Sequence, residues 1–87
     1  MRYFAGDLPG AIGLYEGVVA DKAKAAPQTY QELAWLYYRA GRASDAAGAY
    51  RESLQRYQQQ LAAGNDVDAA RHGIRTSEAA LRVLEME

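Results

Sequence analysis

Few side chains in this 87-residue sequence have the types and spacing that catalysis or metal binding requires. His72 is the only histidine, and Asp68 lies one helical turn before it, which makes half of a metal site. Protein zinc sites draw several ligands from histidine, cysteine and carboxylate side chains, and this chain has no cysteine and no second histidine. We therefore expect His72 to be a solvated helix residue, and we expect no metal ion and no other cofactor.

The serines and glycines also lack the contexts of reactive or phosphate-binding sites. Ser44, Ser53 and Ser77 fall where helix caps or close helix crossings account for them, and none lies in a nucleophile elbow. The glycines near the N-terminus are not followed by the Lys-Ser or Lys-Thr of a phosphate loop. General acid–base and nucleophilic catalysis need convergent reactive groups. We therefore expect that the protein is not an enzyme.

The charge balance and hydropathy argue against two classes of partner. Ten Lys and Arg residues against eleven Asp and Glu residues give a net charge of −1, which offers no basic surface to nucleic acid. No apolar run approaches the ~20 residues that cross a bilayer, and the first residues do not form a signal peptide. We expect no nucleic-acid partner, no membrane partner and a cytoplasmic location.

The composition predicts an all-α fold, because Ala, Leu, Glu, Gln and Arg are plentiful and β-branched residues are few. Pro27 ends a first helix, and Gly41 and Gly64 are left-handed caps that end a second and a third. Asp66 caps a fourth. Short connections make neighbouring helices antiparallel. The expected helices span about 8–25, 28–40, 44–63 and 67–85.

The sequence also repeats itself. A shift of 35 residues aligns four identical pairs: Gly6 with Gly41, Ala11 with Ala46, Gly13 with Gly48 and Tyr15 with Tyr50. This spacing is close to the ~34-residue period of tetratricopeptide repeats, which are pairs of antiparallel helices.

Residues 30–54 resemble one nearly complete tetratricopeptide repeat. The aromatic, leucine, small and glycine positions of such a repeat match Tyr30, Leu33, Ala34, Tyr37, Gly41, Ala46, Tyr50 and Ser53. Residues 6–19 are similar to the turn and second helix of a preceding repeat. The resemblance implies about four helices in antiparallel hairpins stacked as a superhelix: a partial repeat at 1–26, a full repeat at 27–64 and a capping helix at 65–87. It also predicts that Tyr50 packs against Leu33, Tyr37 and Ala46.

In this family the first helix of each repeat lines a concave groove that binds a peptide or another protein. The second predicted helix of this chain is the first helix of its full repeat. Its groove positions are Gln28, Gln31, Trp35, Tyr38 and Arg39. Because Trp, Tyr and Arg dominate binding hot spots, the resemblance implies a scaffold or adaptor that binds a protein or peptide there. Alternatively, Trp35 packs against the fourth predicted helix as ordinary core. The Lys and Asn clamp with which some family members hold a C-terminal carboxylate is not expected, because the matching positions carry Gln31 and Trp35.

The first predicted helix leads to a second hypothesis, self-association. Tyr15, Val18 and Val19 are expected to face the second helix, whereas Ile12 and Leu14 lie on other faces. In an intact array a preceding helix would cover part of that surface, and uncovered apolar patches usually mark interfaces. Four residues would form the contact of a homodimer: Tyr3, Phe4, Ile12 and Leu14. The alternative is a monomer in which Tyr3 and Phe4 fold back over Ile12.

Overall fold

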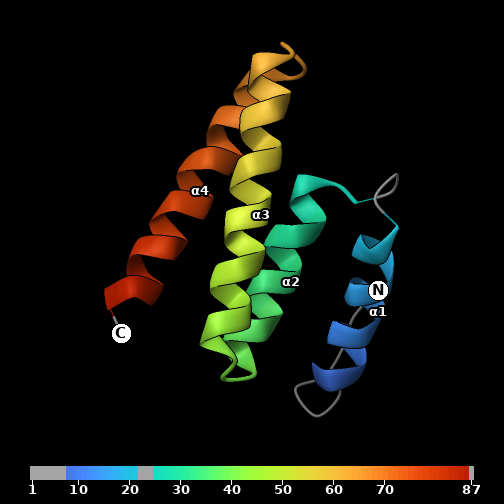
Figure 1. Ribbon diagram of the computed structural model, residues 1–87. Coiled ribbons are helices and arrows are strands. Elements are labelled where there is room, and N and C mark those ends of the chain that lie inside the picture. Colours follow the sequence, from blue (N-terminus) through green and yellow to red (C-terminus); the bar gives the residue numbers. More distant parts are fainter. Residues whose placement is uncertain (1–7, 22–24, 87) are drawn as a thin grey trace.

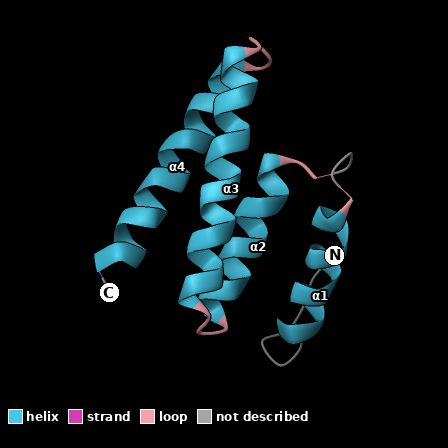
Figure 2. Ribbon diagram, viewed as in Figure 1, coloured by secondary structure: helices cyan, strands magenta, loops and turns pink. Residues whose placement is uncertain are grey.

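The computed structural model describes residues 8–21 and 25–86, and these residues form four helices and no strand (Figure 1). The helices are α1 (Leu8–Ala20), α2 (Pro27–Arg39), α3 (Ala43–Ala62) and α4 (Val67–Met86). The described loops are short connections between them (Figure 2). The predicted all-α class is confirmed.

Consecutive helices run in opposite directions (Figure 1). α2 packs between α1 and α3, and α3 packs along α4. α1 has fewer contacts than the other helices, and all of its close backbone contacts with another helix are to α2. α2 and α4 are both held against α3 and have only a few direct contacts with each other. The central pair, α2 and α3, therefore carries one outer helix on each side.

Local sequence signals set most of the helix ends. Gly41 has a φ of 79°, and beyond it the Arg42 N–H donates to the Tyr37 carbonyl at 2.9 Å, which is a Schellman cap. Gly64, with a φ of 74°, ends α3 in the same way. The Asp66 carboxylate accepts a hydrogen bond from the Ala69 N–H at 3.4 Å and caps α4. These three predicted ends are confirmed.

The end of α1 differs from the prediction. The helix stops at Ala20 rather than near residue 25, and residues 22–24 lie outside the described part of the chain. Asp21, the residue that follows the helix, has weaker helix propensity than the alanine before it.

The hydrophobic core lies where α1, α2 and α3 meet. Its larger buried side chains come from Ile12, Leu33, Leu36 and Tyr37, and Ala34 and Ala46 are fully buried at the crossing of α2 and α3. Alanine at a crossing lets two helix backbones approach closely. The buried residues of this core are Ala11, Ile12, Leu33, Ala34, Leu36, Tyr37, Ala46 and Ala49.

Tyr50 lies against the core residues expected for it but is not fully buried. Its side chain packs against the core but stays partly exposed, because it also forms the floor of clefts between α2 and α4. Among the described tyrosines, Tyr57 is the most buried, at 3% exposure, and it lies about two helical turns after Tyr50 in the interface of α3 with α4. The repeat pattern predicted that Tyr50 packs against the core, but not that its ring also lines the clefts between α2 and α4.

Candidate binding groove between α2 and α4

The groove begins with two aromatic side chains on one face of α2. Trp35 and Tyr38 are 45% and 43% exposed, and they lie three residues apart on the side of α2 that faces α4. The opposite wall comes from α4, where Val83 is also half-exposed. A cleft of about 200 Å³ lies between them, lined by Trp35, Tyr38, Tyr50, Ala80, Val83 and Leu84. Every one of these side chains is apolar or aromatic, so this part of the groove suits an apolar group.

A second cleft continues along α2 toward its N-terminal half. It measures about 460 Å³, and Trp35 and Tyr50 line both clefts. Its other lining residues are more polar: Tyr15, Gln31, Glu32, Leu36 and Thr76. The groove therefore has an apolar end near Tyr38 and a polar end near Glu32, with the Trp35 ring between them.

Arg39 lies over the Trp35 ring, with the guanidinium Cζ 4.9 Å from the ring centroid. This is a cation–π contact, and it holds a flexible side chain against a ring that lines the apolar cleft. The ion pairs among the described residues join Arg42 to Asp45 and Arg56 to Glu52, so Arg39 is not part of either. The guanidinium is thus positioned by an aromatic ring rather than by a carboxylate of the described chain.

Gln31 lies at the polar end of the groove, but its amide is bound inside the molecule. The Nε2 group donates to the Gly73 carbonyl at 3.2 Å and to Ser77 Oγ at 3.0 Å. The Oε1 atom accepts from the Tyr57 hydroxyl at 3.3 Å. Three of the four hydrogen bonds that an amide side chain can make are therefore used. Gln31 ties α2 to α3 and α4, and it leaves little capacity for a partner.

The hydrogen bonds continue through small buried side chains. Ser77 Oγ donates to Ser53 Oγ at 3.3 Å, and Ser53 Oγ donates to the Pro27 carbonyl at 3.0 Å. Both serines are fully buried, and no buried side-chain nitrogen or oxygen of the described residues lacks a partner. A satisfied polar network of this kind fixes one relative position of the helices. The position of α4, and with it the width of the groove, depends on this network.

Of the five predicted groove residues, Trp35 and Tyr38 line the apolar cleft, and Arg39 lies over the Trp35 ring without lining either cleft. Gln31 lines the polar cleft with its amide engaged, as described above. Gln28 is exposed near the start of α2 and lines neither cleft. The α4 wall was not predicted, because Val83 and Leu84 show their role only when α4 is placed beside α2.

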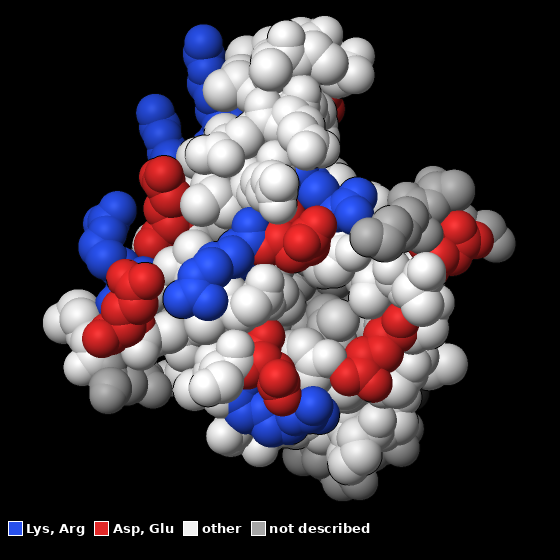
Figure 3. Space-filling view, viewed as in Figure 1, with Lys and Arg blue, Asp and Glu red and all other residues white. Residues whose placement is uncertain are grey.

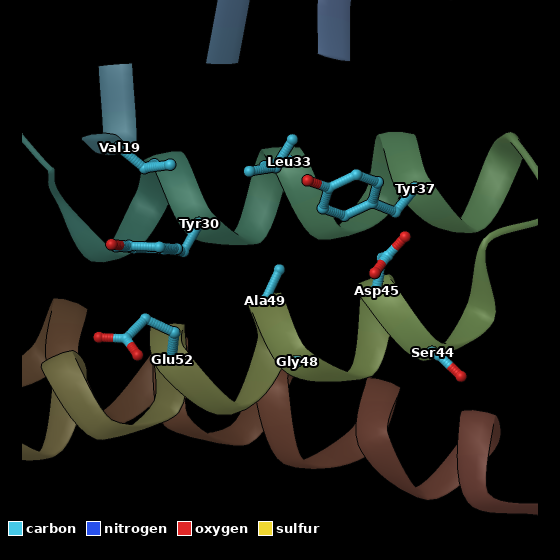
Figure 4. A pocket seen from close by; sticks show the side chains of 9 residues that line it. All are labelled: Val19, Tyr30, Leu33, Tyr37, Ser44, Asp45, Gly48, Ala49 and Glu52. Carbon is cyan, nitrogen blue, oxygen red and sulfur yellow. The ribbon is translucent and has the colours of Figure 1, made fainter. Parts of the chain in front are cut away.

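A further cleft of about 380 Å³ lies on the side of α2 that faces α1 and α3 (Figure 4). Its carboxylates, Asp45 and Glu52, have arginine partners at 2.8 Å and 3.0 Å. Figure 3 shows acidic and basic side chains interspersed over the face it displays. Because these carboxylates already pair with arginines of the same chain, the cleft offers no unpaired charge that would attract a charged ligand strongly.

At the edge of this cleft, the Tyr37 hydroxyl donates a hydrogen bond to the Glu16 carboxylate and so joins α2 to α1. Burial of the ring, followed by the hydrogen bond to Glu16, raises the pKa of Tyr37 to about 12. Both effects favour the neutral phenol, since a phenolate would be poorly solvated and would lie against a carboxylate. The bond is therefore a structural link that holds at neutral pH.

Of the four proposed self-association residues, the structure describes Ile12 and Leu14, and only Leu14 is exposed. Ile12 is 4% exposed and belongs to the core, so its assignment to an exposed contact was wrong. Leu14 is 64% exposed on the outer side of α1, and Tyr3 and Phe4 lie outside the described residues. Val18, expected to face α2, is instead exposed. The buried face follows the spacing of Leu8, Ile12, Tyr15 and Val19, which turns Val18 outward beside Leu14.

His72 is exposed, and the described residues contain no group of three or more His, Cys, Asp or Glu side chains that could hold a metal ion. None of the described helices is long and apolar enough to span a membrane. Comparison of the sequence with models of known protein families, and with curated proteins and solved structures, found no match. The all-α class therefore rests on the structure alone, and the similarity to tetratricopeptide repeats stays a prediction.

Proposed function

We propose that the chain is a cytoplasmic protein–protein interaction module that binds a peptide or protein segment in the groove between α2 and α4. It would act as a scaffold or adaptor rather than as an enzyme. The observation that supports this most strongly is the exposure of Trp35 and Tyr38 side by side at an apolar cleft. A domain of this size has little apolar surface to spare for its core. Leaving two large rings half-exposed forgoes folding stability, and a binding role explains that arrangement.

The groove offers both of the elements that peptide recognition uses. Its apolar cleft can take one large side chain, while Glu32 and Thr76 at the other end can hydrogen-bond to a backbone or a polar side chain. α2 would be the first helix of the full repeat if the resemblance to the tetratricopeptide family holds, and the first helix of each repeat lines the groove in that family. The structural position and the family resemblance thus favour the same surface.

Peptides selected from a random displayed library on the wild-type protein would test this proposal. Replacing Trp35 with Ala should weaken the binding free energy of the selected peptides by about 2 kcal/mol, the scale of an interface hot spot. The loss of folding stability should be smaller, because nearly half of the ring is already exposed. Leu14→Ser, an exposed position on α1 that lines neither cleft, should bind like the wild type. Peptides that bind W35A as tightly as the wild type would refute the groove assignment, and a collapse of the melting temperature would make Trp35 a core residue.

A second candidate function, self-association, has one observation in its favour. Leu14 and Val18 lie one turn apart on the outer side of α1 and are both exposed, so α1 is apolar on the side away from α2 as well. Helices that are apolar all round are normally buried on both sides. A second copy meeting this face through a two-fold contact would bury it.

A further inference from the structure

From the stacking of Arg39 on Trp35, a ring that lines the apolar cleft, we propose a specific chemistry for the partner. The groove recognises a large aliphatic or aromatic side chain that has an acidic side chain next to it in the same segment. The apolar side chain enters the cleft, and the guanidinium of Arg39 binds the carboxylate. This inference rests on the proposed function, because it describes what the same groove selects.

The geometry of Arg39 suits a carboxylate. A guanidinium that stacks on a ring keeps its N–H groups in its own plane, so its edge stays available for hydrogen bonds beyond the ring. A carboxylate matches that edge with two parallel hydrogen bonds, and stacking on Trp35 limits the rotamer freedom that would be lost on binding. Arg39 is exposed and takes part in neither ion pair of the described residues, so a carboxylate partner would not displace an internal one.

The size of the apolar cleft limits which side chain of the partner can enter it. At about 200 Å³ it is smaller than the ~300–1,000 Å³ pockets that hold drug-sized ligands. It therefore has room for one large side chain, and its wholly apolar and aromatic lining excludes a charged one. A carboxylate bound by Arg39 would lie at the edge of the Trp35 ring and next to that side chain.

Glu32 gives the groove a direction. It lies two helical turns before Arg39 on α2, a rise of about 10 Å at ~1.5 Å per residue. An extended segment covers that distance in about three residues at ~3.3 Å each. The Glu32 carboxylate repels an acidic group at its end of the groove and attracts a basic one. The preferred order along the groove is therefore a base near Glu32, an apolar side chain in the cleft and a carboxylate at Arg39.

Capped synthetic peptides and the fluorescence of Trp35, the only tryptophan, provide the test. The probe is acetyl-Gly-Lys-Ser-Leu-Asp-Gly-amide, with variants in which Asp becomes Lys, Asp becomes Ser, or Leu becomes Ala. Amidation removes the terminal carboxylate, so only the side chain can supply the charge. We expect the Leu-Asp peptide to bind roughly tenfold tighter than the Leu-Lys peptide, and the Ala-Asp peptide to bind weakly.

Charge reversal at Arg39 identifies the group responsible. R39E should reverse the preference, so that the Leu-Lys peptide becomes the tighter ligand. R51E makes the same change of net charge on α3, away from the lining of both clefts, and should keep the wild-type order. If both peptides bind the wild type equally while W35A loses both, the groove function stands and the role of Arg39 is overturned. If no peptide in the set binds at millimolar concentration, the groove function fails with it.

Discussion

Gly73 is buried in the middle of α4, and replacing it with Ala should destabilise the protein although alanine is the better helix former. A Cβ atom built at this position would lie 2.3 Å from Cε2 and Cζ of Tyr57. Carbon atoms in contact normally lie ~3.5–4.0 Å apart. The missing side chain is what allows the Tyr57 ring to rest directly on the backbone of α4.

The ring has little freedom to move away. Tyr57 is 3% exposed, and its hydroxyl is hydrogen-bonded to Gln31, which also binds the Gly73 carbonyl. Overpacking of a well-packed interior costs ~1–3 kcal/mol or more, and an overlap above 1 Å belongs at the upper end. The higher helix propensity of Ala offsets about 1 kcal/mol of that loss of stability. We expect a net loss of about 2 kcal/mol, which lowers the melting temperature of a domain this size by about 10 °C.

Gly48 supplies the matched control, because it lies inside α3 with no atom within 4 Å of an added Cβ. Gly48→Ala should raise stability by ~0.5–1 kcal/mol through helix propensity alone. Thermal and urea denaturation followed by circular dichroism measure both variants. A second control replaces Tyr57 with Leu in the Gly73→Ala background, where the two changes should couple favourably in a double-mutant cycle. If Gly73→Ala stabilises the protein as Gly48→Ala does, the close packing of Tyr57 on α4 is refuted.

Two further predictions concern α1. The pKa of Tyr37 is about 12 in the folded state, above its ordinary value of 10.0. The neutral phenol therefore contributes fully to the free energy of unfolding below pH 10, and that contribution is lost as the pH rises toward 12. Denaturation between pH 9 and pH 12 should therefore show Tyr37→Phe losing less stability than the wild type, by on the order of 2 kcal/mol; parallel curves would contradict this. For self-association, light scattering at millimolar concentration should give a dimer mass for the wild type and a monomer mass for Leu14→Ser combined with Val18→Ser, whereas a monomer mass for both proteins would remove that hypothesis.

The features predicted correctly from the sequence are those that depend on a few neighbouring residues. Gly41 and Gly64 end helices because their backbones adopt positive φ, and Asp66 caps α4 with its own side chain. The repeat pattern also identified Ala34 and Ala46 as small positions, and both are fully buried in the core. Each of these signals is complete within one short segment.

The errors arose where a side chain's surroundings come from distant segments. α1 is apolar on several faces, so periodicity alone could not distinguish a buried Ile12 from a buried Val18. Gln31 was assigned to the correct face of α2, but its hydrogen bonds to Tyr57 and Ser77 follow only from the placement of α3 and α4. Gly73 offered a signal that was not used: a glycine inside a regular amphipathic helix often marks a close approach of two elements.

The groove and the interior of the protein are mechanically connected. Its two walls, α2 and α4, have few direct contacts, so the distance between them depends on how each packs against α3 and on the hydrogen bonds of Gln31. α4 lies close to α3 because Gly73 and Ser77 are small at the interface. Packed interiors transmit such displacements instead of absorbing them. A side chain added at Gly73 should therefore move α4 outward, widen the apolar cleft beside Val83 and weaken binding even in the molecules that remain folded, whereas Gly48→Ala should leave binding unchanged.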